Sequence, residues 1–448
     1  MFQKVLIANR GEIAVRIIQA CRDLGVISVA VYSEADREAL HAQIADEAVC
    51  IGPARAADSY LNMDNIISAA LASGCQAIHP GFGFLSENPD FAERTTQAGL
   101  AFIGPTAATI RLMGDKSEAK RNAIAAGVPV ALGTDGPLRD FDEALSEAER
   151  IGYPVMLKAA SGGGGKGIRV AKDVRGLKDA YDSAAAEAVA NFGDGRLYME
   201  KYIENPRHIE VQILGDSFGN VVHLFERECS VQRRHQKLIE ESPSAFVTPE
   251  LRAKMTKAAV DLAKRVGYRN AGTIEFLVDS DRNFYFCEMN TRIQVEHPVT
   301  EQVTGVDLVC EQIRVAAGEP LSFTQNDLEL RGHAIECRIN AEDPSRDFAP
   351  CPGTLVSMHL PGGPGVRMDT AAYQGYKIPP FYDSMIGKLI VYGADRQQAI
   401  ARMRRALAET LFEGVVTGTD YQMHILRSKA FEDAEFNVNS IANGDFDR

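Results

Sequence analysis

A membrane-spanning apolar run, a signal peptide and a paired-cysteine motif are all missing from this 448-residue sequence. No apolar stretch is long enough for a bilayer, and residues 1–7 resemble a short strand that leads into a polar turn. The eight cysteines form no Cys-x-x-Cys pair, which argues against zinc sites and disulfide frameworks. We therefore expect a cytoplasmic protein with reduced thiols. Cys229 alone lies among polar residues, and burial is the favoured explanation even there.

Positive charge is also scarce. Lysine and arginine number 48 against 61 acidic residues, which gives a net charge of −13. This balance argues against a protein that wraps nucleic acid, although basic residues can still cluster locally. A hydrophobic content of 45% and a charged content of 24% are typical of a globular protein, and the length allows two or three domains. Neither nucleic acid nor a membrane is an expected partner.

The common nucleotide-binding motifs are absent as well. The first turn offers only Gly11, so a dinucleotide site is not expected, despite acids at Glu34 and Asp36. A glycine-rich loop at 161–167 lacks the Ser or Thr of a P-loop, since Gly167 follows Lys166. The loop joins two expected strands. It is either a flap whose N–H groups cover phosphates or a surface hairpin without function, and the loop alone does not decide between them.

Hydrophobic periodicity predicts an α/β fold with an α+β C-terminal part. Up to about residue 110, strands and helices alternate as in a doubly wound parallel sheet, which binds ligands at the carboxyl ends of its strands. From residue 207 the pattern becomes antiparallel. Expected strands are 4–8, 28–31, 48–51, 77–79, 101–103, 153–160, 168–171, 196–203, 208–214, 221–226, 273–278, 284–296 and 333–340. Expected helices are 13–24, 63–72, 111–129, 141–150, 177–190, 251–266, 396–410 and 417–428.

Residues 288–296 alternate polar and apolar side chains, which predicts an extended strand with two different faces. The polar face carries Glu288, Asn290, Arg292, Gln294 and Glu296. A solvated strand face is the simpler explanation and the more common case. The apolar residues that lead into this segment favour a buried, functional face.

The same segment predicts a metal site. Glu275 and Glu288 are placed symmetrically about a turn at 279–283, so a regular hairpin sets the two carboxylates opposite each other. Opposed like charges are destabilising and call for a cation. With the Asn290 amide they form an oxygen ligand set suited to Mg²⁺. A shifted strand register would separate the pair and remove the site.

Two further segments carry clustered polar residues. The basic run at 232–237 follows an expected strand and precedes acids, so it forms either a surface salt-bridge cluster or a site for small anions. The strand at 333–340 sets Glu336, Arg338 and Asn340 on one face.

Along nearly its whole length the chain resembles biotin carboxylase, an ATP-grasp enzyme. The matching stretches are 7–14, 79–88, 111–116, the glycine loop, 226–237, 288–300 and 336–343. The resemblance implies a pre-ATP-grasp domain (1–113), a linker helix with the ATP-grasp lid (114–203, lid from about 131), and a C-terminal ATP-grasp and biotin carboxylase region (204–448).

The resemblance also implies roles for individual residues. ATP would contact Lys116, Lys158, Gly163, Gly164, Gly165, Glu200, Lys201, Ile203, His208, Gln232, His235, Glu275 and Glu288. Two Mg²⁺ or Mn²⁺ ions would bind Glu275, Glu288 and Asn290. Bicarbonate would be held by Lys237, Arg292, Gln294 and the Val295 backbone, with Glu296 as general base. Arg338 would bind biotin and stabilise its enolate.

The implied function is ATP- and bicarbonate-dependent carboxylation of biotin through carboxyphosphate. No Met-Lys dipeptide occurs, so the biotin-attachment motif is absent and the biotin is expected on a separate carrier protein. This favours the first half-reaction of acetyl-CoA carboxylase in fatty acid synthesis, with separate carboxyltransferase subunits and a homodimeric enzyme. The alternatives are an ATP-grasp ligase for an amino acid or nucleotide precursor, and a catalytically silent nucleotide-binding protein.

Overall fold

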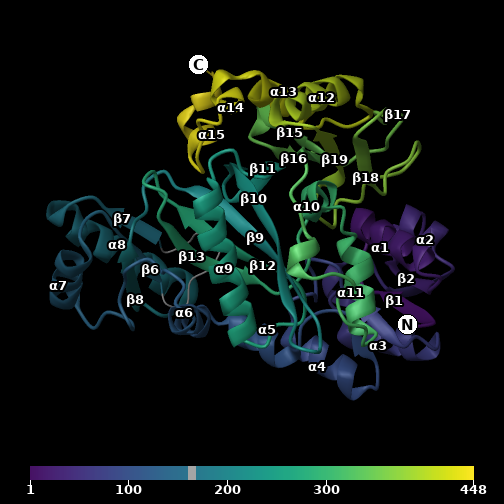
Figure 1. Cartoon of the computed structure of the whole chain (residues 1–448), viewed down its shortest axis with the longest axis horizontal. Helices are drawn as coiled ribbons and strands as arrows, with labels where there is room; N and C mark the ends of the chain where they lie inside the picture. Colours follow the sequence, from purple (N-terminus) through teal and green to yellow (C-terminus); the bar gives the residue numbers. More distant parts are fainter. Residues whose placement is uncertain (160–167, 448) are drawn as a thin grey trace. The chain divides into compact units, whose positions relative to one another are not determined.

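The computed structural model describes residues 1–159 and 168–447, without the side chains of 191 and 192. Gly163, Gly164 and Gly165 of the glycine loop lie outside the described residues, so both interpretations of that loop stay open. The chain forms two compact units (Figure 1). Unit 1 comprises Met1–Val128, Arg207–Phe276 and Cys287–Arg448, and unit 2 comprises Pro129–Pro206 and Leu277–Phe286. Among the described residues, no helix is both long and apolar enough to cross a bilayer.

Unit 1 begins with the doubly wound parallel sheet that the sequence predicts. Its strand order is β3 (Glu47–Gly52), β2 (Ile27–Ser33), β1 (Lys4–Ile7), β4 (Ala77–His79) and β5 (Ala101–Phe102). The helices of this part are α1 (Gly11–Asp23), α2 (Leu40–Ile44), α3 (Met63–Ala72) and α4 (Pro89–Gln97). The buried face of α1 holds Ile13, Ile17 and Cys21, as its 3.6-residue period requires.

The single helix expected over 111–129 is wrong. The structure has two helices instead, α5 (Ala107–Gly114) and α6 (Lys116–Ala125). The Asp115 side chain accepts hydrogen bonds from the backbone N–H groups of Ser117 and Glu118, at 2.8 and 3.0 Å. An N-cap of this kind begins a new helix, which places Lys116 in the first turn of α6.

Unit 2 is built on an antiparallel three-stranded sheet packed against two helices. The strand order is β7 (Ile168–Ala171), β6 (Val155–Ala159) and β8 (Leu197–Lys201), and the helices are α7 (Phe141–Ile151) and α8 (Val174–Phe192). Buried alanines line the inner faces of both helices, which lets them lie close to the sheet.

The largest sheet is formed by strands from the rest of the chain. In the order given next, every pairing from the third strand to the last is antiparallel. Its order is β13 (Phe284–Asn290), β12 (Asn270–Val278), β9 (Arg207–Gly215), β10 (Val221–Arg233), β11 (Gln236–Ser242), β14 (His333–Asn340), β19 (Met385–Gly393) and β18 (Val366–Thr370). Two small ladders pair β15 (Glu342–Asp343) with β16 (Ala349–Pro350), and β17 (Ser357–His359) with β20 (Leu411–Glu413). The α/β and α+β fold class is thereby confirmed.

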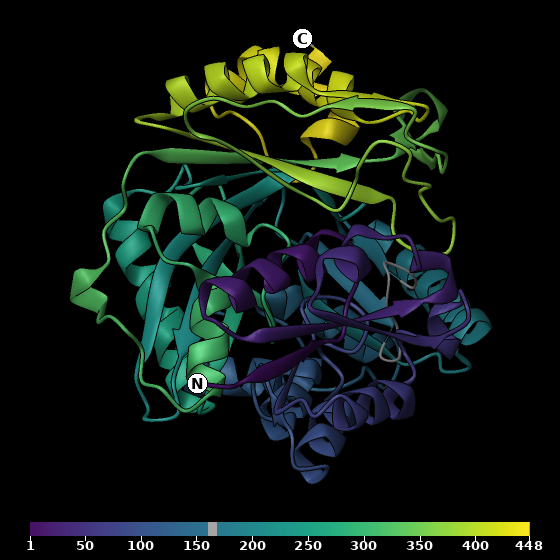
Figure 2. The same ribbon diagram turned by 90° about the vertical axis from the view of Figure 1, so that its right-hand side faces the viewer.

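This part of the chain also contains helices, several of which pack on the sheet. They are α9 (Pro249–Arg265), α10 (His297–Thr304), α11 (Leu308–Ala316), α12 (Arg396–Glu409), α13 (Thr419–Arg427), α14 (Lys429–Glu432) and α15 (Ser440–Asn443). Figure 2 shows the C-terminal helices, in yellow, lying over the green strands, and α12 packs on β19 and β14.

The strand expected to run to residue 296 stops early, at Asn290. Residues 291–296 form a turn, and α10 begins at His297 with Pro298 in its first turn. Proline is well suited to that position because its fixed φ matches the helix and its missing N–H needs no partner. Gln294 and Glu296 are nevertheless buried, 2% and 1% exposed, so the turn directs both side chains inward.

The basic run does not simply follow a strand. It forms the tip of the β10–β11 hairpin, where Arg234 and His235 adopt left-handed φ angles of 49° and 65°. Arg234 forms a salt bridge to Asp347 of 2.9 Å, and Arg233 also pairs with that carboxylate. The outer part of the run is therefore a surface salt-bridge cluster, whereas Gln232 and Lys237 turn toward the buried face described below.

The contacts of Glu241, on β11, predict that the stability of the folded protein depends on pH. The Glu241 carboxylate accepts from His333 at 2.7 Å and from Arg396 at 2.8 Å. Burial alone would raise the pKa of Glu241, but Arg396 and His333 lower it to about 2. A lowered folded-state pKa stabilises the protein above the unfolded value of about 4.3, and this stabilisation is lost as pH falls toward 2.

We expect Glu241→Gln to lower the free energy of unfolding by about 3 kcal/mol at pH 7, and the deficit to shrink between pH 4.5 and 2. Urea denaturation of both proteins at several pH values measures this difference. Glu409→Gln, which removes an exposed partner of Arg405, is the control and should change little at any pH. A deficit that stays constant with pH would contradict the assignment.

Candidate functional site

Lys237, on β11, is the centre of a buried polar cluster in unit 1. Its Nζ lies 2.7 Å from Glu210, 3.2 Å from Glu275, 3.1 Å from Gln294 Oε1 and 2.5 Å from Glu296. These partners come from β9, β12 and the turn before α10, so three distant segments meet at one ammonium group. The Lys237 side chain is only 12% exposed.

Electrostatics fixes the charges in this cluster. Burial alone would lower the pKa of Lys237, but the negative charges of Glu210, Glu275 and Glu296 raise it well above its usual value. Burial would likewise raise the pKa of Glu296, but Lys237 and Arg338 hold it well below its usual range. The cluster therefore contains a permanent ammonium beside an ionised Glu296, in surroundings of low dielectric constant where charges interact strongly.

Arg338, on β14, holds the other side of Glu296. Its Nη2 lies 2.9 Å from Glu296 Oε2, and its Nε donates to Glu240 Oε1 at 2.6 Å. Glu296 thus bridges two cations, since its other oxygen contacts Lys237. Burial raises the pKa of Glu240 to about 7, against the opposing charge of Arg338. A guanidinium that lies between two carboxyl groups can bind a planar oxyanion when the oxyanion displaces one of the two carboxyl groups.

Arg292 and Val295 lie nearer the surface. The Arg292 Nε contacts Glu87 at 2.8 Å, and its Nη2 donates to Asn290 Oδ1 at 3.0 Å. Its side chain is 21% exposed, so a dissolved anion can reach it. Val295 is half-buried, and its carbonyl accepts from Lys388 at 2.8 Å.

The residues proposed to hold metal share one electrostatic environment. Asn290 Nδ2 donates to Glu275 Oε1 at 2.9 Å. Glu288 is exposed, yet desolvation by the surrounding protein, and then the negative charge of Glu275, raise its pKa, while Lys116 opposes this rise. Carboxylate and amide oxygens of this kind fit Mg²⁺, whose charge would relieve the repulsion between the acids. The donor set is therefore compatible with the metal.

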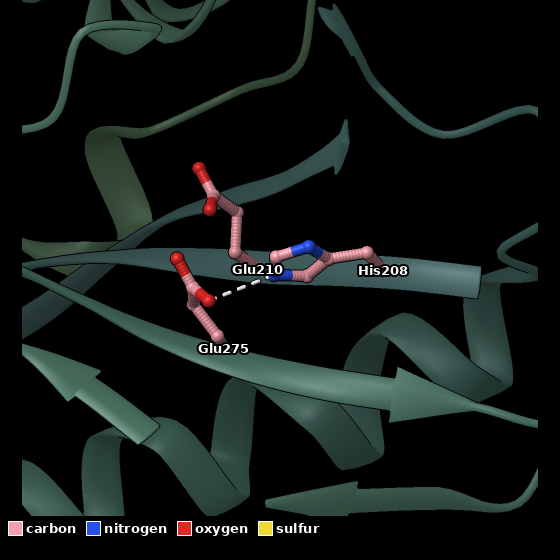
Figure 3. A group of neighbouring side chains, drawn as sticks. All are labelled: His208, Glu210 and Glu275. Carbon is pink, nitrogen blue, oxygen red and sulfur yellow. Dashed lines mark hydrogen bonds and ion pairs between the residues drawn. The ribbon is translucent and has the colours of Figure 1, made fainter. Parts of the chain in front are cut away.

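Figure 3 shows how Glu275 meets the neighbouring strand. His208 and Glu210 project from β9 toward it, and His208 Nε2 lies 2.8 Å from Glu275 Oε2. The ligating atoms of these three residues all lie within 4.8 Å of one another. Burial would lower the pKa of His208, but Glu275 raises it. Gln232 lies 3.3 Å from His208 Nδ1, while His235 is exposed at the hairpin tip.

The other nucleotide-binding candidates lie in unit 2. Lys158 of β6 forms a salt bridge to Glu200 of the neighbouring β8. Lys201 donates to the carbonyls of Gly152 and Tyr153 at 3.0 and 2.7 Å, and Ile203 lies just beyond β8. The nucleotide-binding candidates of unit 2 described above therefore lie on β6, on β8 or just beyond β8.

Several residues of the cluster escaped the sequence analysis. They are Glu87, Glu210, Arg227, Glu240 and Lys388. Arg227 is fully buried and contacts Glu210 at 2.6 Å, Gln212 at 2.7 Å and Thr300 at 3.0 Å. Lys388 could have been noticed in the sequence, because it is the single lysine inside an otherwise apolar segment. A lysine in such a segment is rarely buried unless it has a specific partner.

Cys229, singled out for its polar surroundings, is fully buried, and burial raises the pKa of its thiol well above the usual value. A thiol in this state is a poor nucleophile, which supports the structural explanation.

Known families match almost the entire chain. Residues 1–110 match the family described as biotin carboxylase, N-terminal domain, and residues 336–443 match the biotin carboxylase C-terminal domain. Residues 115–324 match the ATP binding domain of the carbamoyl-phosphate synthase L chain.

Individual relatives align over nearly their full length. "Biotin carboxylase 1" of Bacillus subtilis is 55% identical over 99% of both chains. One of the pyruvate carboxylase subunits of Methanothermobacter thermautotrophicus is 56% identical over 98% of this chain and 90% of its own. The crystal structure of the biotin carboxylase domain dimer of Hydrogenobacter thermophilus 2-oxoglutarate carboxylase is 51% identical, with a TM-score of 0.92 over 99% of this chain and 98% of its own. That structure is described as a complex with MgADP, ADP and bicarbonate. The likeness to these enzymes, together with the acid-bridged cations of the buried cluster, shows that the chain belongs to the biotin carboxylase family of ATP-grasp enzymes.

Proposed function

We propose that this enzyme uses ATP and bicarbonate to carboxylate biotin on a separate biotin carboxyl carrier protein, as the first half-reaction of an acetyl-CoA carboxylase in fatty acid synthesis. The observation that carries the chemistry is Glu296, which bridges Lys237 and Arg338. Lys237 is suited to bind bicarbonate and Arg338 to bind the biotin enolate, and the carboxylate base Glu296 lies between them.

The first step is nucleophilic attack by bicarbonate on the γ-phosphate of ATP. Lys237, Arg292, Gln294 and the Val295 backbone hold the bicarbonate, and Glu296 removes its proton. The resulting oxygen forms a bond to phosphorus, and ADP leaves with the electrons of the broken P–O bond, which yields carboxyphosphate. The lysine and arginine offset the clustered negative charge.

The second step transfers carbon to biotin. Carboxyphosphate breaks its C–O bond to give CO₂ and phosphate, and phosphate takes the proton of the biotin ureido nitrogen. The biotin enolate then forms an N–C bond to CO₂. Arg338 faces the enolate oxygen with a planar fork that a lysine lacks.

The low pKa of Glu296 is unusual for a base, and ligand binding explains how the residue becomes one. In the structure both cations stabilise its charge directly. Bicarbonate bound at Lys237 brings a competing negative charge, which raises the basicity of Glu296. The base is thereby activated when bicarbonate is bound.

Nucleotide contacts are proposed from each unit. In unit 2 they are Lys158, Glu200, Lys201, Ile203 and the glycine loop with Gly163, Gly164 and Gly165. In unit 1 they are Lys116, His208, Gln232, His235, Glu275 and Glu288. Glu275, Glu288 and Asn290 would hold two Mg²⁺ or Mn²⁺ ions, which supply charge neutralisation at the phosphates when bound.

The proposed partners are the carrier protein, carboxyltransferase subunits and a second copy of this chain. The relative from Hydrogenobacter thermophilus is described as a dimer, which supports the homodimer. Eight free thiols support a reducing, cytoplasmic location. The relative from a pyruvate carboxylase favours a second candidate, in which the final acceptor is a 2-oxo acid. Because the transferase selects the acceptor, pull-down of native partners separates the two.

The direct test is ADP release with and without bicarbonate and biotin. We expect release to depend on bicarbonate and to increase with biotin. Release that is independent of bicarbonate would reject the proposed function.

Lys237→Gln should separate ATP binding from bicarbonate use. We expect kcat/KM for bicarbonate to fall about 10²-fold, because a buried charge-assisted contact is lost, while the ATP KM changes less than about threefold. Initial rates at varied bicarbonate and varied ATP measure the two effects. Lys257→Gln, which removes an exposed partner of Asp261, is the control and should behave like the wild type. Wild-type turnover in Lys237→Gln would refute the bicarbonate assignment.

A further inference from the structure

Lys388 is a buried cation that the steps above do not use. It lies on β19, directly beside Arg338 of β14 and Asp369 of β18 in the strand register. Its side chain is 0% exposed. A lysine is rarely buried completely without a specific partner, so its contacts identify what it does.

The Lys388 ammonium connects two parts of unit 1. Its Nζ donates to the Val295 carbonyl at 2.8 Å and lies 3.3 Å from Glu12 Oε2, in the first turn of α1. The ring of Phe82 lies 5.9 Å away. Burial would lower the pKa of Lys388, but Glu12 and Glu336 raise it, so the group stays charged. A charged donor forms a stronger hydrogen bond than a neutral one.

The Val295 carbonyl is one of three consecutive carbonyls held in this turn. The Ile293 carbonyl accepts from Arg292 Nη1 at 3.3 Å, and the Gln294 carbonyl contacts His297 Nδ1 at 2.8 Å. Each donor fixes the plane of one peptide group, because the carbonyl and the following N–H belong to one rigid unit. The Lys388 contact fixes the peptide that joins Val295 to Glu296.

We propose that Lys388 is a positioning residue for bicarbonate binding, which acts through the Val295 carbonyl to orient Val295 and the base Glu296. The inference rests on the proposed function of this turn. Lys388 contacts the backbone of the turn, whereas Lys237 contacts the Gln294 and Glu296 side chains. Small errors in the placement of a base and its substrate are costly in rate.

A purely structural role for Lys388 makes a different prediction. If the residue only neutralised Glu12, then removal of either partner would have the same effect. The Glu12 carboxylate has no hydrogen-bond partner among the described residues and meets Lys388 only as an ion pair, and burial raises its pKa to about 7, so Gln is a close substitute there. Glu12→Gln removes the ion pair but retains the bond from Lys388 to Val295.

The experiment compares the wild type with Lys388→Met, Glu12→Gln and the double variant. We expect Lys388→Met to raise the bicarbonate KM about tenfold, the effect of one lost charged hydrogen bond. The ATP KM should stay within about twofold, since no assigned nucleotide contact is touched. The double variant leaves no unpaired Glu12 carboxylate and should show the same tenfold rise. Glu12→Gln should keep the bicarbonate KM within about twofold of the wild type, although its melting temperature falls.

Two results overturn the inference alone: an unchanged bicarbonate KM in Lys388→Met and the double variant, or an equal rise in Glu12→Gln. A wild-type enzyme whose ADP release ignores bicarbonate overturns the proposed function and this inference together. The two failures are therefore distinguishable.

Discussion

Glu296→Gln is expected to lower kcat for biotin carboxylation by about 10²–10⁴-fold, the usual contribution of a general base. The amide cannot accept the bicarbonate proton, yet it has nearly the same size and can still accept a hydrogen bond from Lys237. ATP binding should therefore persist, with a KM within about threefold of the wild type. The loss should affect ADP release with and without biotin, because proton removal precedes both.

The matched control is Glu311→Gln, at another buried carboxylate, on α11 and outside the cluster. It should retain kcat, even if it melts at a lower temperature. Steady-state ADP release and phosphate release at saturating ATP measure the effect. A Glu296→Gln enzyme with more than about a tenth of wild-type kcat would show that another group is the base.

The local part of this site could be predicted from the sequence because its side chains cluster along the chain. Glu288, Asn290, Arg292, Gln294 and Glu296 lie within nine consecutive positions, 288–296. Alternation indicated one polar face, and resemblance supplied the roles. The doubly wound sheet was similarly accessible, since its strands are short apolar segments and the periodicity predicts two of its helices, α1 and α3, whereas α2 and α4 were not predicted.

The geometry behind this face could not be predicted. Alternation suggested a strand through residue 296, whereas the proline at 298 starts a helix and a turn delivers Gln294 and Glu296 to the same cluster. A strand and a turn can thus both direct Gln294 and Glu296 toward the interior of the protein. Capping at Asp115 similarly divided a helix that periodicity alone made continuous.

The buried partners were harder still. Glu210, Glu240 and Lys388 come from β9, β11 and β19, which are separated by many residues. A charged residue in a strand is usually solvent-exposed, and only tertiary pairing reveals that it is buried. Their importance follows from electrostatics, since each sets the charge state of a residue that the sequence did identify or lies beside one.

Arg338→Lys is expected to lower biotin-dependent turnover by about 10²–10³-fold, because a single ammonium cannot replace the planar fork that faces the enolate. In the wild type, Nε contacts Glu240 while Nη2 contacts Glu296, so two nitrogens are already oriented by two carboxyl groups. A lysine keeps the charge but loses this orientation. Bicarbonate-dependent ADP release without biotin should fall less than about fivefold, since Lys237 still holds the carbonate side of Glu296.

This split between the two rates distinguishes enolate stabilisation from a general loss of structure. Arg396→Lys is the control, because Arg396 also pairs with a buried glutamate, Glu241, at 2.8 Å but lies outside the cluster. It should lower stability and leave both rates near the wild type. If Arg338→Lys depressed the rates with and without biotin equally, then Arg338 would act by maintaining Glu296, and the enolate would have to be stabilised by another residue.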